Sequence, residues 1–399
     1  MKKILYVLHS GITGGTFLTN KDLMKHVKND YEVFLLSAEN NFLKLFLYYN
    51  NNLKLIKEYP LKEIWDVKNV HSSWLTYVYF DILMNNKIDI VHIRHLINHS
   101  FDLPQVAYKL NIPVVLSFHD FYFICPSYPL INENNEYCEG ICSNSKINCY
   151  CPLYTLEDIN FKEIIPFWRD NVLKLFGYVD CFITTSDIVK NLFLSIYPML
   201  KNKKFEVIEH GRDFPQLKEI YHDIPSKDKP IKILCPTNYL NKMKGSELIK
   251  NIKKEDKNNL LEFHFLGNIR DNLEEYGICH GTFERDEFYK KVKEIKPSFI
   301  GIFSTWPETF CHTITEAWSS GIPVIGTNIG VIEDRIIKNN GGWIVDKNDS
   351  KKAYEKILNI SYNKDAYLSI LDNIKNIELK STKEMSKKYL DIYKNLDNF

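Results

Sequence analysis

The sequence predicts an α/β protein made of two doubly wound, Rossmann-like domains that face each other across a cleft. Three observations support this fold class. Short apolar segments with the character of buried strands alternate with helix-like segments along most of the chain. A polar stretch rich in Lys, Asp and Pro, residues 215–230, interrupts the alternation and is typical of a linker. The alternation then begins again, which predicts a first domain over residues 1–214 and a second over residues 231–375.

The first domain is expected to begin with a buried strand over residues 1–8, because this segment is rich in Ile, Leu, Val and Tyr. Residues 17–29 carry apolar side chains at helical spacing, and residues 31–37 return to strand. Residues 42–56 predict two strands around an Asn-Asn-Asn turn, because Asn tolerates left-handed backbone; a helix lying on a membrane surface is the alternative. Further strands are expected over residues 88–92, 113–118, 181–185 and 205–209.

The second domain repeats the pattern, with helices between its strands. Its strands are expected over residues 231–235, 261–266, 298–303, 323–326 and 342–345. Residues 376–399 predict one Lys-rich C-terminal helix, which packs on its own domain or crosses back to the first. Ligands of open parallel sheets bind beyond the carboxyl ends of the strands, so we expect functional residues in the loops that follow these strands.

Composition and charge exclude several classes of protein. The 399 residues include 51 basic and 50 acidic side chains, and the net charge of +1 argues against a nucleic-acid binder that relies on overall positive charge. A hydrophobic fraction of 45% and a charged fraction of 25% are ordinary for a soluble globular protein. The first apolar run, residues 4–8, is too short for a signal peptide, and no 18 consecutive apolar residues occur. We therefore expect a cytoplasmic protein, with peripheral contact at the inner face of a membrane left open.

The segment over residues 306–323 carries the strongest functional signal. Gly321 suits the position just after a helix and Pro323 cannot continue one, so a helix is expected to begin near Thr309, directly after a strand. The free N–H groups of its first turn would bind phosphate or sugar oxygens. Glu308 lies at the start of this helix and Glu316 eight residues further on, roughly 12 Å away. Two carboxylates at this distance match the length of a nucleotide sugar; two solvated helix charges are the alternative.

This segment resembles the signature of family 4 of the retaining glycosyltransferases, which have the GT-B fold. The match consists of Glu308, seven intervening residues, Glu316, and then Ala-x-x-x-Gly-x-Pro-Val. Other pieces agree with the family in their order along nearly the whole chain: Gly14-Gly15-Thr16, His119-Asp120, Thr185-Ser186, residues 207–213, Lys244-Gly245, residues 265–267 and residues 326–330. The resemblance implies a GT-B enzyme that uses a nucleotide sugar.

The resemblance also implies a donor site in the second domain. Glu316 would bind the ribose, Glu308 the transferred sugar and Lys244 the diphosphate. Sugar and phosphate oxygens would be bound by the segment Thr309, Phe310, Cys311 and His312. Retention is then expected from front-face attack, in which the departing phosphate helps to take the acceptor proton and no carboxylate nucleophile is needed.

In the first domain, the resemblance places the loop with Gly14 and Gly15 over the phosphates and His119 near the reacting sugar, although a core position for His119 is the alternative. His95 and Asp120 would line the acceptor site. The spacing of His95 with two further histidines also raises the possibility of a metal site, but no carboxylate pair completes it. Those two are His92, which is expected to be packed, and His99.

One departure from the family concerns the diphosphate. The family usually has an Arg five residues before the Lys of Lys-Gly, and here that position is Tyr239, which cannot supply the paired charge of a guanidinium. Lys242, Arg212 and Arg285 are the candidates to replace it. Arg212, beside Gly211, is preferred because the chain has only six Arg; a structural pairing with Asp213 is the alternative.

The nine cysteines are an odd number, and in a reducing compartment they argue against a disulfide framework. Five of them lie in a polar insertion over residues 125–151. Four thiolates around Zn²⁺ would order such a loop, so a structural zinc is a hypothesis for this insertion; free thiols are the alternative. The four ligands would be Cys138, Cys142, Cys149 and Cys151.

Taken together, the sequence predicts a retaining glycosyltransferase that moves a sugar from a nucleoside diphosphate sugar to a glycan or lipid-linked acceptor. Analogy with the family adds a role in bacterial-type surface polysaccharide synthesis. No metal cofactor is expected for catalysis, because Lys and helix N–H groups can balance the diphosphate and no Asp-x-Asp motif follows a strand. The alternatives are a non-catalytic two-domain sugar-binding protein and a nucleotide-sugar epimerase of the same fold.

Overall fold

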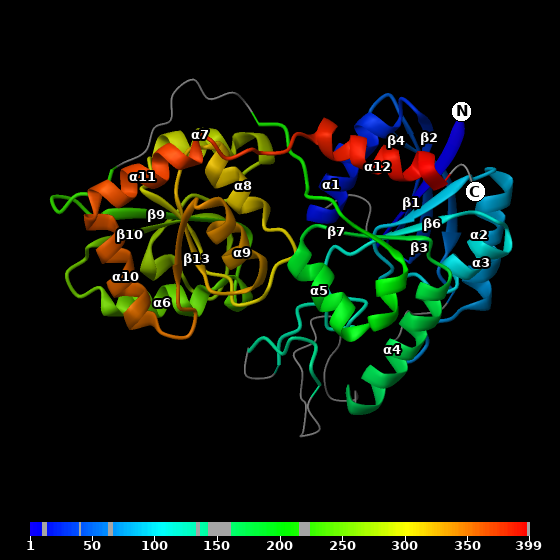
Figure 1. Cartoon of the computed structure of the whole chain (residues 1–399), viewed down its shortest axis with the longest axis horizontal. Coiled ribbons are helices and arrows are strands. Elements are labelled where there is room, and N and C mark those ends of the chain that lie inside the picture. Colours follow the sequence, from blue (N-terminus) through cyan, green and yellow to red (C-terminus); the bar gives the residue numbers. More distant parts are fainter. Residues whose placement is uncertain are drawn as a thin grey trace. The chain divides into compact units, whose positions relative to one another are not determined.

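The structure, a computed structural model, describes residues 1–9, 14–39, 41–62, 67–132, 136–142, 161–214 and 224–396. The chain forms two compact units (Figure 1). The first unit contains residues 1–133, 138–213 and 380–399, and the second contains residues 134–137 and 214–379. The chain therefore returns to the first unit for its C-terminal helix.

The first unit is built on an eight-stranded sheet in the order β4-β3-β2-β1-β5-β6-β7-β8. Its strands are β1 (Lys2–Leu8), β2 (Tyr31–Glu39), β3 (Phe42–Tyr49), β4 (Asn52–Pro60), β5 (Ile90–Ile93), β6 (Val114–Ser117), β7 (Cys181–Thr184) and β8 (Lys204–Val207). The strand β3 runs opposite to the others and pairs antiparallel with β2 and β4, whereas all other pairs in this sheet are parallel. The β3–β4 hairpin turns at Asn50 and Asn51, whose φ angles are 50° and 63°. The two strands predicted for residues 42–56 are therefore confirmed, and the membrane-surface helix is excluded.

The helices of the first unit cover both faces of this sheet. They are α1 (Gly15–Val27), α2 (Ser73–Asn85), α3 (Leu103–Lys109), α4 (Phe161–Gly177), α5 (Asp187–Ile196), the 3₁₀ turn η2 (Pro198–Asn202) and α12 (Thr382–Leu396). In Figure 1, α1 in blue and α12 in red lie side by side. Both helices pack their apolar residues on the same cluster of strand side chains, which includes Ile4, Tyr6, Val33 and Ile90.

The helix α12 begins at Thr382, six residues later than the expected start at residue 376. The cause is a capping box: Ser381 Oγ accepts a hydrogen bond from the Glu384 amide (3.2 Å), and Glu384 Oε2 accepts one from the Ser381 amide (2.8 Å). Asp213 adds a second anchor, because its carboxylate accepts hydrogen bonds from the Thr382 amide and hydroxyl (3.1 and 2.7 Å). The helix is thus tied at its first turn to the end of the first unit's sheet.

The second unit is built on a six-stranded, fully parallel sheet in the order β11-β10-β9-β12-β13-β14. Its strands are β9 (Ile231–Leu240), β10 (Leu261–Ile269), β11 (Ile278–Cys279), β12 (Phe299–Ile302), β13 (Val324–Thr327) and β14 (Gly342–Val345). Its helices are α6 (Ser246–Glu255), α7 (Phe288–Ile295), α8 (His312–Ser319), α9 (Gly330–Asn339), α10 (Ser350–Tyr362) and α11 (Lys364–Ile374), with 3₁₀ turns η3 (Lys242–Lys244), η4 (Glu274–Tyr276) and η5 (Arg285–Glu287). This alternation of strands and helices forms the second doubly wound fold that the sequence predicts.

Two apolar clusters fill the two faces of the second sheet. Because side chains alternate along a strand, Ile233 of β9 faces the cluster formed with α6 and α10, whereas Leu234 faces the cluster formed with α7, α8 and α9. The helix α11 contributes to both clusters, through Tyr367 and Ile370. The central strands are therefore buried on both faces, which accounts for their predominantly apolar sequences.

Each sheet has one point at which the direction of winding reverses, and this point positions the candidate sites. In the first sheet it lies between β1 and β5, and in the second between β9 and β12. The loops after two such strands run to opposite faces of the sheet and leave a crevice at their carboxyl ends. Among the described residues, no helix has both the length and the apolar composition needed to cross a bilayer.

Candidate functional site

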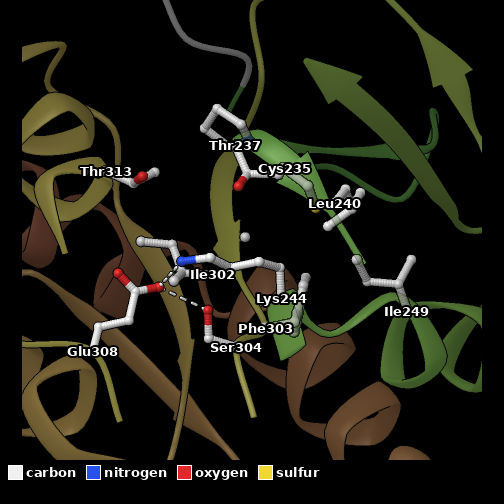
Figure 2. Close-up of a pocket in the computed structure, with 12 residues that line it drawn as sticks. Cys235, Thr237, Leu240, Lys244, Ile249, Ile302, Phe303, Ser304, Glu308 and Thr313 are labelled. Carbon is white, nitrogen blue, oxygen red and sulfur yellow. Dashed lines mark hydrogen bonds and ion pairs between the residues drawn. The ribbon is translucent and has the colours of Figure 1, made fainter. Parts of the chain in front are cut away.

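In the second unit, a pocket lies at the carboxyl ends of β9 and β12 (Figure 2). Its apolar lining comes from Cys235, Pro236, Leu240, Ile249, Gly301, Ile302 and Phe303, and its polar lining from Thr237, Lys244, Ser304, Glu308 and Thr313. Figure 2 shows the Lys244 ammonium and the Glu308 carboxylate pointing toward each other in this pocket. The structure thus brings together two residues that the sequence assigns to one site, and it does so at the point where the sheet reverses its winding.

The Lys244–Glu308 ion pair is short and partly buried, with 28% of the Lys244 side chain and 14% of the Glu308 side chain exposed. Lys244 Nζ donates a hydrogen bond to Glu308 Oε1 at 2.6 Å, and Ser304 Oγ donates to the same oxygen at 2.9 Å. Burial of the carboxyl favours its neutral form, but the charge and hydrogen bond of Lys244, together with Ser304, outweigh burial and lower the pKa of Glu308. Lys244 Nζ also lies 5.2 Å from the centroid of the Trp306 ring. Glu308 is therefore ionised, and its charge is balanced by Lys244.

The helix α8 begins at His312, three residues later than the expected start at Thr309. Cys311 occupies the N-cap with φ of 61°, a left-handed conformation that cannot be part of a right-handed helix. Arg335 of α9 fixes this turn: its Nη1 donates to the carbonyl oxygens of Phe310 and Cys311, both at 2.9 Å. The loop residues 309–311 therefore stand ahead of the helix, and the partly positive N-terminal end of α8 follows directly.

Glu316 lies on α8 with only 9% of its surface exposed, within a run of consecutive buried residues from Ile314 to Trp318. The helix ends as predicted: Gly321 has φ of 70° and donates its amide to the carbonyl of Trp318 (2.9 Å). Both glutamates of the sequence signature are thus located on the loop–helix segment that follows β12. Glu316 lies on the helix, whereas Glu308 lies in the loop before it.

At the position of the missing family arginine, the structure provides a different one. Tyr239 near the end of β9 is 51% exposed, and the guanidinium carbon of Arg270 lies 4.9 Å from the centroid of its ring. Arg270 directly follows β10, which pairs with β9 in parallel. Of the candidates from the sequence, Lys242 lies in η3 and Arg285 in η5.

In the first unit, His95 and Asp120 form a hydrogen-bonded pair at the carboxyl ends of β5 and β6. His95 Nε2 lies 2.9 Å from Asp120 Oδ2, and His95 Nδ1 accepts a hydrogen bond from the Ile97 amide at 3.1 Å. Because an amide can only donate, Nδ1 carries no proton, and the proton is therefore on Nε2. His95 is 1% exposed, so it orients Asp120 rather than presenting itself to solvent. Burial raises the pKa of Asp120, but His95 and the Tyr122 amide outweigh burial and lower it.

His119 follows β6, and its ring stacks on that of His210 with a centroid distance of 5.6 Å and an interplanar angle of 6°. Burial, followed by the charge of Arg94, lowers the pKa of His119 well below its usual value, so the ring is neutral at pH 7. Gly14 caps α1 with φ of 97°, a left-handed conformation that favours glycine, and no heavy atom of the described residues lies within 4 Å of a Cβ added at Gly14 or Gly15.

Arg212 is buried in the first unit, with 7% of its surface exposed, and its amide donates to the carbonyl of Lys380 (2.9 Å). Asp213, the alternative partner from the sequence, binds Thr382 and lies 3.9 Å from Lys25. The role of Arg212 at the diphosphate stays a prediction.

The three histidines with metal-like spacing use their ring nitrogens within the protein. His92 is packed, as expected, and its nitrogens lie 2.6 Å from the Tyr393 hydroxyl and 2.8 Å from Ser117 Oγ. His99 Nε2 donates to the Leu8 carbonyl at 2.8 Å. Among the described residues, no group of three or more His, Cys, Asp or Glu side chains is placed to hold a metal.

The zinc hypothesis stays a prediction. Cys138 and Cys142 are described, and Cys142 Sγ lies 3.9 Å from the Gly140 carbonyl oxygen. Cys149 and Cys151 lie outside the described residues.

Sequence reasoning did not single out Ser304, Trp306, Arg335 or Arg270, although each touches a residue of the candidate site. Ser304 and Trp306 are ordinary residues in a loop, and only their contacts with Glu308 and Lys244 give them a role. Arg335 and Arg270 could have been found from one signal, the scarcity of Arg. The chain has six Arg among 51 basic residues, so each Arg marks a position where a planar guanidinium is needed.

Two doubly wound units, the second with a Lys–Glu pair beside a helix N-terminus, define a GT-B glycosyltransferase. The model of Glycosyltransferase Family 4 matches residues 14–214, and the model of Glycosyl transferases group 1 matches residues 218–376. The chain belongs to Glycosyltransferase Family 4.

Individual relatives are distant in sequence. The chain is 24% identical over 360 residues to an uncharacterized 42.6 kDa protein in the cps region of Klebsiella pneumoniae, covering 84% of this chain and 86% of that protein. Among solved structures, sucrose-phosphate synthase from Thermosynechococcus elongatus has a TM-score of 0.65 at 13% identity and 99% coverage of both chains. A glycosyltransferase from Rickettsia africae has a TM-score of 0.65 at 19% identity, covering 99% of this chain and 98% of its own. HepE from Anabaena in complex with UDP-glucose has a TM-score of 0.61 at 12% identity, covering 99% of this chain and 100% of its own.

Proposed function

We propose that this protein is a retaining glycosyltransferase that moves a sugar from a nucleoside diphosphate sugar to a glycan or lipid-linked acceptor in surface polysaccharide synthesis. The observation that carries the proposal is the Lys244–Glu308 pair at the switch point of the second sheet, next to the N-terminal end of α8. HepE, a structural neighbour, was crystallised with UDP-glucose, which supports the donor class. The relative encoded in a cps region supports a role in surface polysaccharide.

In this proposal, the donor binds in the second unit. Its diphosphate takes over Lys244 from Glu308, and its sugar then binds the released carboxylate of Glu308. Glu316 accepts hydrogen bonds from the ribose, while the segment Thr309–His312 and the positive end of α8 bind the phosphate oxygens. Arg270, stacked on Tyr239, supplies the positive charge that the family draws from an arginine at position 239. Because Lys244 and Arg270 supply the positive charge that balances the diphosphate, no divalent metal is needed in this proposal, and turnover should continue in the presence of EDTA.

The first unit would hold the acceptor. Asp120, positioned by His95, accepts a hydrogen bond from an acceptor hydroxyl, and neutral His119 lies near the reacting sugar. The turn at Gly14 and Gly15 adjoins the phosphates. Attack of the acceptor oxygen breaks the bond between the sugar and the diphosphate, and the diphosphate oxygen that leaves helps to take the acceptor proton.

A panel of nucleoside diphosphate sugars tests this function. We expect slow release of nucleoside diphosphate from one member of the panel, measured by coupled nucleotide detection, with EDTA present. Binding without release of nucleotide would instead indicate a sugar-binding protein. Interconversion of the sugar without an acceptor would indicate an epimerase.

The site assignment makes a separate prediction about affinity for the free nucleoside diphosphate released in that panel. Glu316→Ala removes the proposed ribose acceptor and Arg270→Ala removes the proposed diphosphate charge, so each should weaken binding about 10-fold or more in calorimetry. Lys291→Ala removes a cation of the second unit that pairs with Glu294 on α7, and this control should leave the affinity unchanged. Equal affinity in all four proteins would remove Glu316 and Arg270 from the donor site.

A further inference from the structure

Arg94 is a fully buried cation of the first unit that has no acidic partner among the described residues. It directly follows β5 and is 0% exposed. Its Nη1 lies 3.4 Å from Ser117 Oγ, and its guanidinium carbon lies 5.4 Å from the centroid of the Tyr389 ring. Its Nε and Nη2 have no hydrogen-bond partner. Three of the five N–H donors of Arg94 are therefore unsatisfied within the described part of the chain.

A guanidinium cannot escape this situation by losing its proton, because its pKa lies far above neutral pH. Burying an unpaired charge is strongly unfavourable, so natural proteins pair such groups. The side chains around Arg94 are hydroxyl, imidazole and aromatic groups, and Ser117 is shared with His92 at 2.8 Å. Asp120, at the end of the next strand, is committed to His95 and to the Tyr122 amide. The Arg94 guanidinium therefore requires an anionic partner, and the described residues provide none.

The location of Arg94 points to a ligand as this partner. Arg94 lies where the first sheet reverses its winding, between the carboxyl ends of β1 and β5, and its amide binds the Val7 carbonyl of β1 at 2.8 Å. His9, which follows β1, has a second unsatisfied group there: its Nδ1 is buried without a hydrogen-bond partner.

Two imidazoles lie at the same carboxyl edge of the sheet. His9 follows β1 and His119 follows β6, and both are partly exposed, whereas Arg94 is fully buried. Burial and then His95 lower the pKa of His9 to about 3, and burial and then Arg94 lower that of His119. Both rings are therefore neutral at pH 7, and the positive charge of this cluster resides on Arg94.

We infer that the carboxyl edge of the first sheet binds a phosphate-type oxyanion, with Arg94 as its counter-charge and His9 and His119 as hydrogen-bond partners. On the function proposed above, on which this step rests, the oxyanion is the phosphate of a phosphate-linked acceptor or the diphosphate of the donor. Both sources share the same chemistry, since an oxyanion and a guanidinium form paired, charge-assisted hydrogen bonds.

Inorganic phosphate is the probe, and thermal unfolding of the full chain is the measurement. Phosphate replaces chloride at constant ionic strength, and Lys244→Ala serves as the background so that the diphosphate site of the second unit does not contribute. We expect the Tm of Lys244→Ala to rise by about 2 °C or more at saturating phosphate. The rise should disappear in Lys244→Ala/Arg94→Met and persist in Lys244→Ala/Lys174→Met, the control for loss of an exposed cation of the first unit.

The same variants measured without phosphate test whether Arg94 has a merely structural role. Arg94→Met removes an unpaired buried charge, so in chloride buffer its Tm should equal or exceed that of wild type. Arg94→Lys keeps the charge but loses the planar fork, and it should retain only part of the phosphate effect.

Affinity for UDP, measured by calorimetry, distinguishes the two sources of the oxyanion. A loss of 5-fold or more in Arg94→Met assigns the donor diphosphate, whereas an unchanged affinity together with a lost phosphate effect assigns the acceptor. The inference is overturned if phosphate does not raise the Tm of Lys244→Ala, if it does so equally in the Arg94→Met double variant, or if Arg94→Met alone lowers the Tm in chloride buffer. None of these results bears on nucleotide release in the donor panel, so the proposed function stands or fails separately.

Discussion

At the level of single residues, the Lys244–Glu308 contact has a consequence for ligand affinity. The ammonium that is proposed to bind the diphosphate is occupied, at 2.6 Å, by the carboxylate that is proposed to bind the sugar. A nucleoside diphosphate without a sugar has to break this contact and gains nothing from the released carboxylate. A complete donor breaks the same contact and satisfies both partners. The pair therefore favours the intact donor over the spent nucleotide.

Glu308→Gln should consequently separate binding from turnover. Because Gln cannot form the ion pair, Lys244 is free in the variant, and affinity for UDP should stay equal or rise up to about 10-fold. Turnover with the donor identified in the panel should fall about 100-fold or more, since the proposed contact with the transferred sugar loses its charge. Calorimetry and initial rates measure the two effects.

Ser304→Ala is the matched control for this experiment, because it removes a hydrogen bond to the same carboxylate oxygen and keeps the ion pair. We expect it to lower turnover by less than 10-fold. Weaker UDP binding in Glu308→Gln would contradict the competition between carboxylate and diphosphate.

The residues of the candidate site divide by how they could be found. The spacing of Glu308 and Glu316 predicts a shared site, and the resemblance to the family adds Lys244 to it. Arg270 and Arg94 lie outside these motifs, and their significance depends on what surrounds each guanidinium. Arg270 stacks on the Tyr239 ring, and Arg94 has no acidic neighbour among the described residues. Both features depend on tertiary structure, so a local sequence pattern cannot predict them.

At the level of elements, the loop before α8 stores backbone strain at the donor site. Cys311 adopts φ of 61°, which costs a residue with a side chain of the order of 1 kcal/mol, and Arg335 stabilises this turn by two hydrogen bonds to its carbonyl oxygens. The sequence predicted a helix from Thr309 because no Gly or Pro marks the left-handed position. The error of three residues arises from a tertiary contact with α9, a helix that lies further along the chain.

Substitutions of Cys311 should reveal this strain. Cys311→Gly relieves the left-handed conformation and should change the free energy of unfolding by no more than about 1 kcal/mol. Cys311→Val forces a β-branched side chain into the same conformation and should destabilise the protein by about 2 kcal/mol or more. Urea unfolding measures both values. Cys235→Val is the matched control, because Cys235 is buried on β9 in ordinary strand conformation; an equal loss in both valine variants would contradict the strain.

The helix α12 offers a second prediction at this level. Tyr393 places its hydroxyl 2.6 Å from His92 Nδ1 and 3.1 Å from the Tyr6 hydroxyl, so one atom of α12 joins β5 to β1. Tyr393→Phe leaves these buried groups without a partner and should destabilise the protein by about 1–3 kcal/mol. Tyr389→Phe removes a hydroxyl that makes no hydrogen bond to the described residues, on the same face of the same helix, and should cost less than about 0.5 kcal/mol. Similar losses in the two variants would show that ring packing, not the hydroxyl, carries the effect.

At the level of the whole molecule, the buried histidines predict acid sensitivity of the first unit. Burial lowers the pKa of His9 to about 3 and that of His99 to about 4, and it lowers the pKa values of His92 and His119 well below their usual value. Below pH 6.5 the unfolded chain binds protons that the folded chain does not, so acid favours unfolding. His99 alone should cost about 2 kcal/mol of stability between pH 7.5 and pH 5. Urea unfolding at the two pH values measures this loss.

His99→Gln removes one of these groups and should reduce the loss between the two pH values by about 2 kcal/mol, whatever its effect at pH 7.5. His71→Gln is the matched control, because the His71 side chain is half exposed and pairs with Asp102. The same pH dependence in wild type and in His99→Gln would show that His99 is not the group that titrates.

Most of the fold could be predicted from the sequence because its strands are buried on both faces. Segments such as Phe299–Ile302 have to be apolar throughout, and the helices between the strands have to be amphipathic, so each element carries its own signal. The ends of helices were less predictable. The start of α12 is set by a capping box at Ser381 and by Asp213, which lies 169 residues away from Thr382 in the sequence. Contacts between residues so far apart produce no periodic pattern in the sequence, so they could not be predicted from it.

The return of α12 to the first unit also affects how the chain is made. Residues 1–213 are synthesised long before residues 382–396, and the second unit is synthesised between them. During that interval the sheet face around Tyr6, His92 and Arg94 lacks the aromatic side chains that cover it in the finished protein. The first unit therefore exposes this aromatic and polar surface until α12 has been synthesised. The second unit is complete before α12 is synthesised, so it can fold before the first unit does.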